Sequence, residues 1–514
     1  TAFANDTLYE GWGWMLYLVD EETGAFARLL PGARPAMPYR TLYGPAETVY
    51  RFETERLSGE TAVCVCPDAP ELRIHVTLHK SAAGRFRLVG FVDWLMGSDA
   101  RDARFLRTWT RDGACFAAGT DAHIGYFAAA NARVYPGCGR TAFLGRGTIQ
   151  APEGLGGCRE TCGGWVLNVP VQLRSDVPQR FDWVIGAAAQ PQQAYARVRA
   201  FYGRPDYDSA RARALGEWKR HADRLRIETP DASVNRMGNG WLLHQTLASR
   251  VRGRTGLYQP GGAYGFRDQL QDMLALLPFD PRRVRDHILR CAARQFEDGD
   301  VMHWWHEPML GVRTKIADDM LFLPYVTAKY VLWTMDHSIL TEPVAYLENV
   351  EIEPGREDRF CQMRPGEVKE SLHGHCMRAF RRASSVGGHG LALMGGGDWN
   401  DGMNRVGIQG RGESVWLSEF LAVCASLYAQ VCPDDADRAW LLALSDRMSA
   451  AVEQYGWDGE WYLRAYHDSG AVLGGAKSPS CRIDAISQAW AVLAGLDEER
   501  CRRAMDAAWR SLVD

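Results

Sequence analysis

The part of the chain best suited to acid–base chemistry is Leu391–Gly407, which reads LALMGGGDWNDGMNRVG. Its three consecutive glycines predict a tight turn or a close approach of the backbone to a ligand. Two carboxyl groups follow, at Asp398 and Asp401, with Trp399 between them. A carboxyl group beside an aromatic wall can have a raised pKa and donate a proton. The competing interpretation is an Asx-rich turn between two helices, with Asp398 bound to backbone amides.

A second candidate is Tyr258–Asp272, which reads YQPGGAYGFRDQLQD. A glycine-rich loop leads directly into a helix that begins at Arg267 and Asp268. Asp268 and Asp272 are four residues apart and so share one helix face. The planar guanidinium of Arg267 can donate to a hydroxyl or a carboxylate. A helix start with acids in its first turn is an equally good interpretation of these residues.

A third candidate is Asp300–Asp319, in which His303 and His306 flank two tryptophans. A metal site is one interpretation, but no further ligand follows at a usual spacing. We therefore predict no metal and interpret the stretch as cleft lining or packing. Ser371–Cys376, SLHGHC, is likewise interpreted as structural.

The composition excludes several classes of protein. The net charge is −4 without any block of like charge, so neither nucleic acid nor an anionic membrane surface is predicted as a partner. No apolar run reaches the roughly 18 residues that span a bilayer. The thirteen cysteines are scattered, which favours reduced thiols and a cytoplasmic location. Eighteen tryptophans fit either sugar recognition or a large core.

Elements that alternate apolar and polar residues dominate residues 1–190 and predict an antiparallel β-sandwich. The clearest of these runs are Glu71–Lys80, Phe86–Trp94, Gly125–Tyr135, Trp165–Leu173 and Gln179–Ile185. Residues 191–228 then read as a helical linker that is interrupted at Gly203-Arg204-Pro205.

The remaining residues, 229–514, show apolar stripes at helical spacing. About nine helices are predicted, near 233–250, 268–277, 283–296, 318–335, 367–385, 413–431, 436–455, 482–495 and 498–513. Sandwich, linker and helical part together predict a multidomain β + α protein with an (α/α)6 toroid. Such a toroid has twelve helices, and the last stripe runs to Asp514, so about three helices are expected beyond it. The first residue is Thr1, so a longer parent chain is expected.

These motifs, taken together, resemble glycoside hydrolase family 94. The family's most specific motif is GGGDWNDGMN, and YGFRDQLQD, DVMHWWH, GVRTKIADD, GESVWL and DGEWYLRAY recur in the same order. The family holds inverting cellobiose, chitobiose and β-1,2-oligoglucan phosphorylases and the C-terminal domain of cyclic β-1,2-glucan synthases. QPGGAYGFRDQLQD and HWWH are typical of the synthase and oligoglucan branch. The resemblance covers essentially the whole chain and implies the same sandwich, linker and (α/α)6 barrel.

The resemblance also implies roles for individual residues. Asp401 matches the general acid, and Trp399 matches a wall of the subsite for the cleaved glucosyl unit. The implied substrate-binding residues are Arg267, Asp268, Asp398, Trp399 and Arg313. Arg254, in RTGLY, resembles an arginine that contacts phosphate. Two departures stand out: no histidine follows His467 to match a further phosphate ligand, and Gly374 occupies a position where an acidic residue is expected.

The implied reaction is phosphorolysis of a β-glucan oligosaccharide to α-glucose 1-phosphate, with phosphate as co-substrate and no cofactor. The fragment alone is expected to show weak or no activity. One alternative is an inverting hydrolase in which Asp268 or Asp398 activates water. Another is a non-catalytic module that binds glucan or controls chain length inside a membrane glucan synthase. A homodimer or a fusion to such a synthase fits either interpretation, and a purely structural toroid is disfavoured by GGGDWNDGMN.

Overall fold

The computed structural model describes most of the chain and divides it into two compact units, residues 1–226 and 227–514. The described residues are 13–32, 38–53, 57–80, 84–97, 100–120, 122–156, 163–173, 177–252, 263–306 and 309–513.

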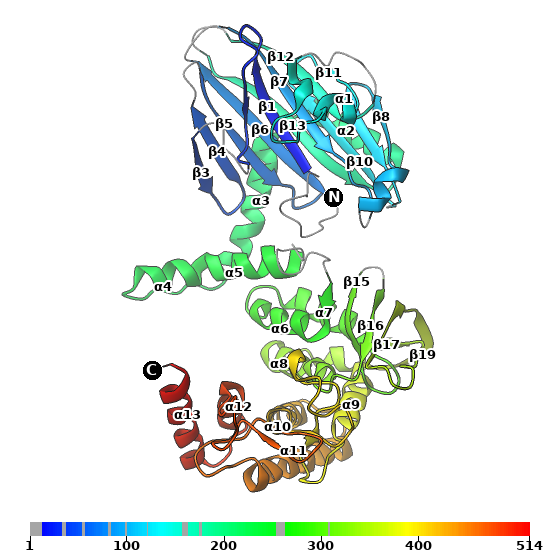
Figure 1. Ribbon diagram of the computed structural model, residues 1–514, viewed down its shortest axis with the longest axis vertical. Coiled ribbons are helices and arrows are strands. Elements are labelled where there is room, and N and C mark those ends of the chain that lie inside the picture. Colours follow the sequence, from blue (N-terminus) through cyan, green and yellow to red (C-terminus); the bar gives the residue numbers. More distant parts are fainter. Residues whose placement is uncertain are drawn as a thin grey trace. The chain divides into compact units, whose positions relative to one another are not determined.

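The first unit is a sandwich of two antiparallel sheets (Figure 1). The smaller sheet has the order β11-β12-β7-β1-β2, formed by Tyr135–Pro136, Val166–Leu173, Gly84–Asp93, Gly13–Asp20 and Phe26–Arg28. The larger has the order β3-β4-β5-β6-β13-β10-β9-β8, formed by Tyr39–Tyr43, Thr48–Glu53, Leu57–Val65, Glu71–Lys80, Gln179–Ala188, Ile124–Ala130, Ala114–Ala118 and Arg107–Arg111. All five strand runs expected from the sequence are present, so the predicted sandwich is confirmed.

Side-chain alternation along the strands explains how this unit is packed. Leu88 of the smaller sheet and Trp183 of the larger one belong to a single buried apolar cluster. Neighbouring residues on β13 and β10 point the other way, and Val184 and Tyr126 pack on α2 (Pro191–Gly203). One sheet therefore has two buried faces, because period-two alternation supplies apolar side chains to both.

Two helices follow the sandwich, α2 and α3 (Tyr207–Ala222). The chain leaves the first at Arg204 and starts the second after Asp206, whose side chain accepts a hydrogen bond from the Ser209 amide. Proline at position 205 cannot continue a helix, so the break lies where the sequence predicts it. The division into 1–190, 191–228 and 229–514 is finer than the two units and stays a prediction.

The second unit is mainly helical, and each of the nine predicted segments contains a helix (Figure 1). The first, residues 232–252, combines α4 (Ala232–Arg236) and α5 (Leu242–Gln245) with two π-helical turns. The others are α6 (Phe266–Leu276), α7 (Pro281–Ala292), α8 (Phe322–Thr334), α9 (Leu372–Ala383), α10 (Val415–Ala429), α11 (Asp435–Tyr455), α12 (Ala485–Leu493) and α13 (Glu498–Leu512).

The helices alternate between an inner and an outer layer. In the inner layer α6 packs on α8, α8 on α10 and α10 on α12. Each inner helix also packs on an outer neighbour, for example α10 on α11 and α12 on α13. An aromatic cluster joins three inner helices, because Phe420 contacts Phe322, Tyr325 and Trp490. This layering is the pattern expected of an (α/α) barrel.

The loops of this unit differ from the expectation of an almost entirely helical region. They carry short antiparallel strands, listed by sheet as β14 (Tyr264–Gly265), β15 (Met302–His306), β16 (Leu310–Thr314) and β18 (Asp358–Gln362); β17 (Pro343–Leu347) and β19 (Pro365–Ser371); and β20 (Ala392–Leu393), β21 (Glu413–Ser414), β22 (Ala465–Tyr466) and β23 (Val472–Leu473). Long loops must satisfy their backbone polar groups, and pairing into hairpins does so.

No helix within the described ranges is long and apolar enough to cross a membrane. Those ranges also hold no cluster of three or more potential metal ligands. Cys138 is disulfide-bonded, so the expectation that every cysteine is a free thiol is wrong at this residue, while ten others are free.

Candidate active site

The glycine-rich loop before Asp401 packs backbone to backbone against the segment that precedes α8. The amide of Gly396 donates to the Lys315 carbonyl (2.8 Å), and the Ala317 amide donates to the Gly397 carbonyl (2.9 Å). A Cβ on Gly395 would lie 2.5 Å from the Lys315 oxygen, and its φ of 59° is in the left-handed region. Glycine is needed here for close approach, and the contact joins two loops that carry acidic residues.

Asp398 anchors the same loop from inside the barrel. Its side chain is fully buried and pairs with the Arg464 guanidinium (Nη2 to Oδ1, 2.5 Å). Its other oxygen accepts from the Ser414 hydroxyl (2.8 Å), and Oδ1 also accepts from the Asn400 amide (3.1 Å). All these contacts are within the protein, and they hold the turn that carries Trp399 and Asp401.

Arg267 is the centre of the site. It is 5% exposed, and its Nη1 lies 2.8 Å from Asp318 Oδ1 and 3.3 Å from Asp319 Oδ1. The same nitrogen donates to the Asp398 carbonyl (3.1 Å), and Nη2 donates to Asp401 Oδ1. One guanidinium therefore ties the start of α6 to both acidic loops, which the fork geometry of arginine allows.

His303 of β15 approaches Asp401 from another side. Its Nδ1 lies 2.7 Å from Asp319 Oδ2, and its Nε2 lies 3.8 Å from Asp401 Oδ2. Burial by itself lowers the pKa of His303, but the negative charges of Asp319 and Asp401 outweigh it and raise the pKa. The imidazole is thus held toward its charged form beside the carboxyl group.

The exposed part of the site combines an aromatic ring with carboxyl groups. Trp399 is 44% exposed, and its ring lies 6.0 Å from the Arg267 guanidinium. Asp401 is 58% exposed, and Asp268 is also exposed on the first turn of α6. An exposed indole offers an apolar face for a pyranose ring, while the carboxyl groups offer acceptors for its hydroxyls.

Electrostatics distinguishes the buried acids from the exposed ones. Asp318 is fully buried, and burial raises its pKa well above the usual range despite the nearby Arg267. Asp319 is buried as well and pairs with both Arg267 and His303. The two acids hold the cations around Asp401 and are shielded from solvent themselves.

Of the residues that the sequence analysis selected, Asp401, Trp399, Arg267 and Asp398 come together through these contacts, and Asp268 lies next to Arg267. Arg313 is placed differently. Its guanidinium is buried, makes a bidentate pair with Asp300 (2.7 Å for each bond) and also binds Asp298 and Asn349. These contacts assign Arg313 to a structural network. Arg254 lies outside the described residues.

Sequence reasoning missed three members of the site. Asp318 and Asp319 end the stretch Asp300–Asp319, where neither was given a role, yet both bind Arg267. Arg464 belongs to the DGEWYLRAY motif, which was recognised without a role for this residue. The signal that could have found it is a single charged residue within the apolar run Trp461–Tyr466.

The buried Asp398–Arg464 pair should be important for stability. Replacing Arg464 with methionine leaves the Asp398 carboxylate buried without its cation, which typically costs about 3–5 kcal/mol. Urea unfolding measures this loss. Arg502→Met is the matched control, because its pair with Glu498 is solvent-exposed and should contribute less than about 1 kcal/mol. Equal losses in the two variants would contradict the role given to Asp398.

The charge state of His303 gives a second prediction. In a pH titration followed by NMR, its imidazole should titrate above the ordinary value of 6.5. Asp319→Asn should lower the midpoint, because it removes a negative charge that raises the pKa of His303, while burial still lowers that pKa. A raised pKa of His303 stabilises the folded protein at low pH, and this stabilisation is lost as the pH rises through the folded-state pKa. A midpoint unchanged by Asp319→Asn would refute the coupling.

Comparison with solved structures first identifies the class of fold. A bacterial glucoamylase complexed with acarbose superimposes with a TM-score of 0.60, covering 97% of this chain and 72% of the glucoamylase. At 9% sequence identity this likeness concerns the fold alone. It agrees with a β-sandwich followed by an (α/α) barrel.

The chain belongs to the glycosyl hydrolase 94 superfamily. The catalytic domain of that superfamily matches residues 217–514, and its supersandwich domain matches residues 1–203. The resemblance inferred from the motifs is therefore confirmed.

Curated relatives include a synthase and several phosphorylases. The cyclic beta-(1,2)-glucan synthase of Rhizobium meliloti (strain 1021) is 35% identical over 100% of this chain and 19% of its own length. The solabiose phosphorylase of Paenibacillus borealis is 32% identical over 72% of this chain and 46% of its own length. The N,N'-diacetylchitobiose phosphorylase of Vibrio proteolyticus is 25% identical over 68% of this chain and 45% of its own length. The chain thus spans less than half the length of each of these relatives.

Proposed function

We propose that this chain supplies the general acid and the glucosyl subsite of an inverting β-glucan phosphorylase. The observation that carries the proposal is the state of the carboxyl groups around Arg267. Asp318, Asp319 and Asp398 are buried in ion pairs, whereas Asp401 is exposed beside Trp399. Asp268, on the first turn of α6, is the other exposed carboxyl group of the site and would be the base of an inverting hydrolase. A phosphorylase needs no base, because phosphate is itself an anionic nucleophile, and the phosphorylase relatives favour this second reaction.

In the proposed reaction Asp401 donates its proton to the glycosidic oxygen as the bond to the anomeric carbon breaks. Hydrogen phosphate attacks that carbon from the opposite face and forms the new carbon–oxygen bond. The leaving sugar departs as a neutral alcohol. The remaining phosphate proton passes to solvent or back to Asp401, which restores the acid. Attack from the opposite face converts a β-linkage into α-glucose 1-phosphate.

The contacts of Asp401 indicate which oxygen holds the proton. Oδ1 accepts from Arg267, which has only donors, so a proton on that oxygen would oppose the guanidinium. Oδ2 is 3.8 Å from His303 Nε2 and makes no such bond in the described site. We assign the transferable proton to Oδ2, with Arg267 fixing the orientation of the carboxyl group. His303 then acts as a positioning residue that balances the charge left after proton transfer.

Phosphate must bind opposite the acid, where cations and amide donors offset its charge. Arg254 is the residue proposed for this role from the family resemblance. The proposal needs no cofactor and no resident metal, since the nucleophile is the co-substrate.

A second candidate function is a chain-length-controlling or glucan-binding domain of a cyclic glucan synthase. The observation in its favour is that the synthase relative matches 100% of this chain. In that case Asp401 and Trp399 would bind glucan without phosphorolysis. Fusion to such a synthase would also place the module next to a membrane, although these residues would remain outside it.

Phosphate dependence separates these functions. The full-length gene product is incubated with a β-1,2-glucan oligosaccharide, with and without inorganic phosphate, and sugar release is followed over time. A phosphorylase releases sugar in proportion to phosphate at sub-saturating concentration and stays at background without it. Equal release of free glucose in both reactions would identify a hydrolase, and no release in either would favour the binding module.

A further inference from the structure

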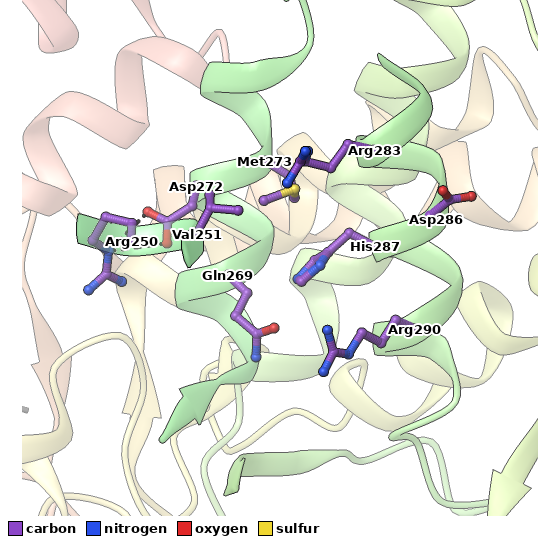
Figure 2. A pocket seen from close by; sticks show the side chains of 9 residues that line it. All are labelled: Arg250, Val251, Gln269, Asp272, Met273, Arg283, Asp286, His287 and Arg290. Carbon is purple, nitrogen blue, oxygen red and sulfur yellow. Dashed lines mark hydrogen bonds and ion pairs between the residues drawn. The ribbon is translucent and has the colours of Figure 1, made fainter. Parts of the chain in front are cut away.

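A polar cavity lies on the side of α6 that faces α7. Its volume is about 250 Å³, and it is bounded by the π-helical turn that ends the first helix, by α6 and by α7 (Figure 2). Seven of its nine lining residues are polar or charged, and the other two, Val251 and Met273, are apolar.

The sequence spacing explains why these side chains meet. Gln269, Asp272 and Met273 are at positions i, i+3 and i+4 of α6, so they share one face. The four α7 residues that line the cavity repeat at the same spacing from position 283 to position 290. Two polar helix faces therefore oppose each other, where packed helices ordinarily bury apolar stripes.

The buried, unpartnered side chain of Gln269 indicates that the cavity binds a ligand. It is 6% exposed, yet neither its Nε2 nor its Oε1 has a hydrogen-bond partner among the described residues. Figure 2 shows its amide extending from α6 toward His287 and Arg290 of α7. Buried amides are nearly always hydrogen-bonded in folded proteins, so the Gln269 amide indicates a ligand that can both donate and accept hydrogen bonds.

Three arginines and two aspartates line the cavity, and ion pairs hold two of the arginines. Arg250 pairs with Asp272 (3.1 Å), and Arg283 pairs with Asp280 at its rim (3.1 Å). Asp286 and Arg290 lie four residues apart on α7 and carry opposite charges. A phosphate site needs several cations that can bind the anion, whereas Arg250 and Arg283 are engaged in ion pairs, and the lining offers both donors and acceptors, as a ring of hydroxyl groups requires.

We propose that this cavity is a secondary saccharide site that holds one neutral pyranose ring of a glucan chain. Drug-sized ligands occupy pockets of about 300–1,000 Å³, so a smaller cavity fits a single ring. Met273 and Val251 supply the apolar surface, and Gln269 bridges two hydroxyls through its amide. The identity of the sugar as glucose rests on the proposed function, whereas the neutral polyhydroxylated chemistry rests on the cavity alone.

The site would hold a glucan chain on α6, the helix that carries Arg267 in its first turn. A chain anchored there would raise the local concentration of further glucosyl units near the barrel. The active-site subsite and the secondary site would then be two independent saccharide sites on one chain, separable by mutation.

Isothermal titration calorimetry with a β-1,2-linked glucose disaccharide tests the proposal. The background variant is Trp399→Ala, which removes the aromatic wall of the active-site subsite. This variant should still bind one disaccharide per chain, and adding Gln269→Leu should weaken that binding at least tenfold. Gln271→Leu is the matched control, because it makes the same change on the same helix outside the cavity and should leave the affinity within twofold.

A second cavity variant and a titration with phosphate complete the test. Asp286→Asn, at the exposed rim, should also weaken binding and serves if thermal melting shows that Gln269→Leu does not fold. Titration with inorganic phosphate should show no heat that depends on Gln269. Disaccharide binding unchanged in both cavity variants, or Gln269-dependent binding of phosphate instead, would overturn the proposal. Because the titrations contain no turnover, an absence of phosphorolysis leaves this test independent of the proposed function.

Discussion

Asp401→Asn should lower phosphorolysis of an unactivated β-glucoside by about 10²–10⁴-fold in the full-length gene product. Asparagine keeps the size of the side chain and most of its hydrogen bonding but cannot donate an acid proton, and general acid catalysis is worth about this factor. Substrate affinity should change little, because the amide can still contact the glycosidic oxygen. Steady-state kinetics with phosphate at saturation measures the loss.

The leaving group distinguishes an acid from a structural residue. With an aryl glucoside, whose leaving group needs little protonation, the defect of Asp401→Asn should be much smaller. Asp398→Asn is the internal comparison, since Asp398 is buried against Arg464 and Ser414 and acts through loop geometry. It should impair activated and unactivated substrates alike. A folded Asp401→Asn protein with equal defects on both substrates would contradict the assignment.

Arg267→Met should have the largest effect on the fold of the site. Arg267 contacts Asp318, Asp319 and Asp401, and it is itself 5% exposed. Removing the cation leaves buried carboxylates without compensation, so the free energy of unfolding should fall by about 3–5 kcal/mol. Turnover should fall with it, because Asp401 loses the contact that orients Oδ1. Urea unfolding and steady-state kinetics on the same preparation measure both effects.

A double-mutant cycle with Asp318→Asn tests the cause. If Arg267 mainly compensates buried charge, neutralising Asp318 in the Arg267→Met protein should restore part of the lost stability. Turnover should not recover, since Asp401 remains without its guanidinium partner. Additive destabilisation by the two substitutions would show that the Arg267–Asp318 contact contributes little.

Much of the fold was predictable because local periodicity determines it. The run Glu71–Lys80 alternates along its length and forms β6 with the same bounds. The helical stripes from residue 233 onward each contain a helix, and the break at Pro205 ends α2 where proline must. The short strands of the loops were not predicted, because they depend on pairing between segments and not on their own sequence pattern.

The site was predictable only as a set of motifs. GGGDWNDGMN and YGFRDQLQD indicated Asp401 and Arg267 as chemical residues, but not that one binds the other across 134 residues. Asp318 binds Arg267 across 51 residues, and its motif did not indicate this partner. The motif that contains Arg313 likewise did not show that its guanidinium is buried in ion pairs with Asp298 and Asp300. Single-sequence patterns carry no information about such long-range pairs.

The most direct test of the central claim is NMR identification of the sugar product formed from a β-1,2-glucan oligosaccharide and phosphate. The full-length gene product should form glucose 1-phosphate with the α configuration, recognised from its phosphorus signal and anomeric proton coupling, and Asp401→Asn should remove that signal. Free glucose formed without phosphate, or a β-configured phosphate ester, would contradict inverting phosphorolysis at this site.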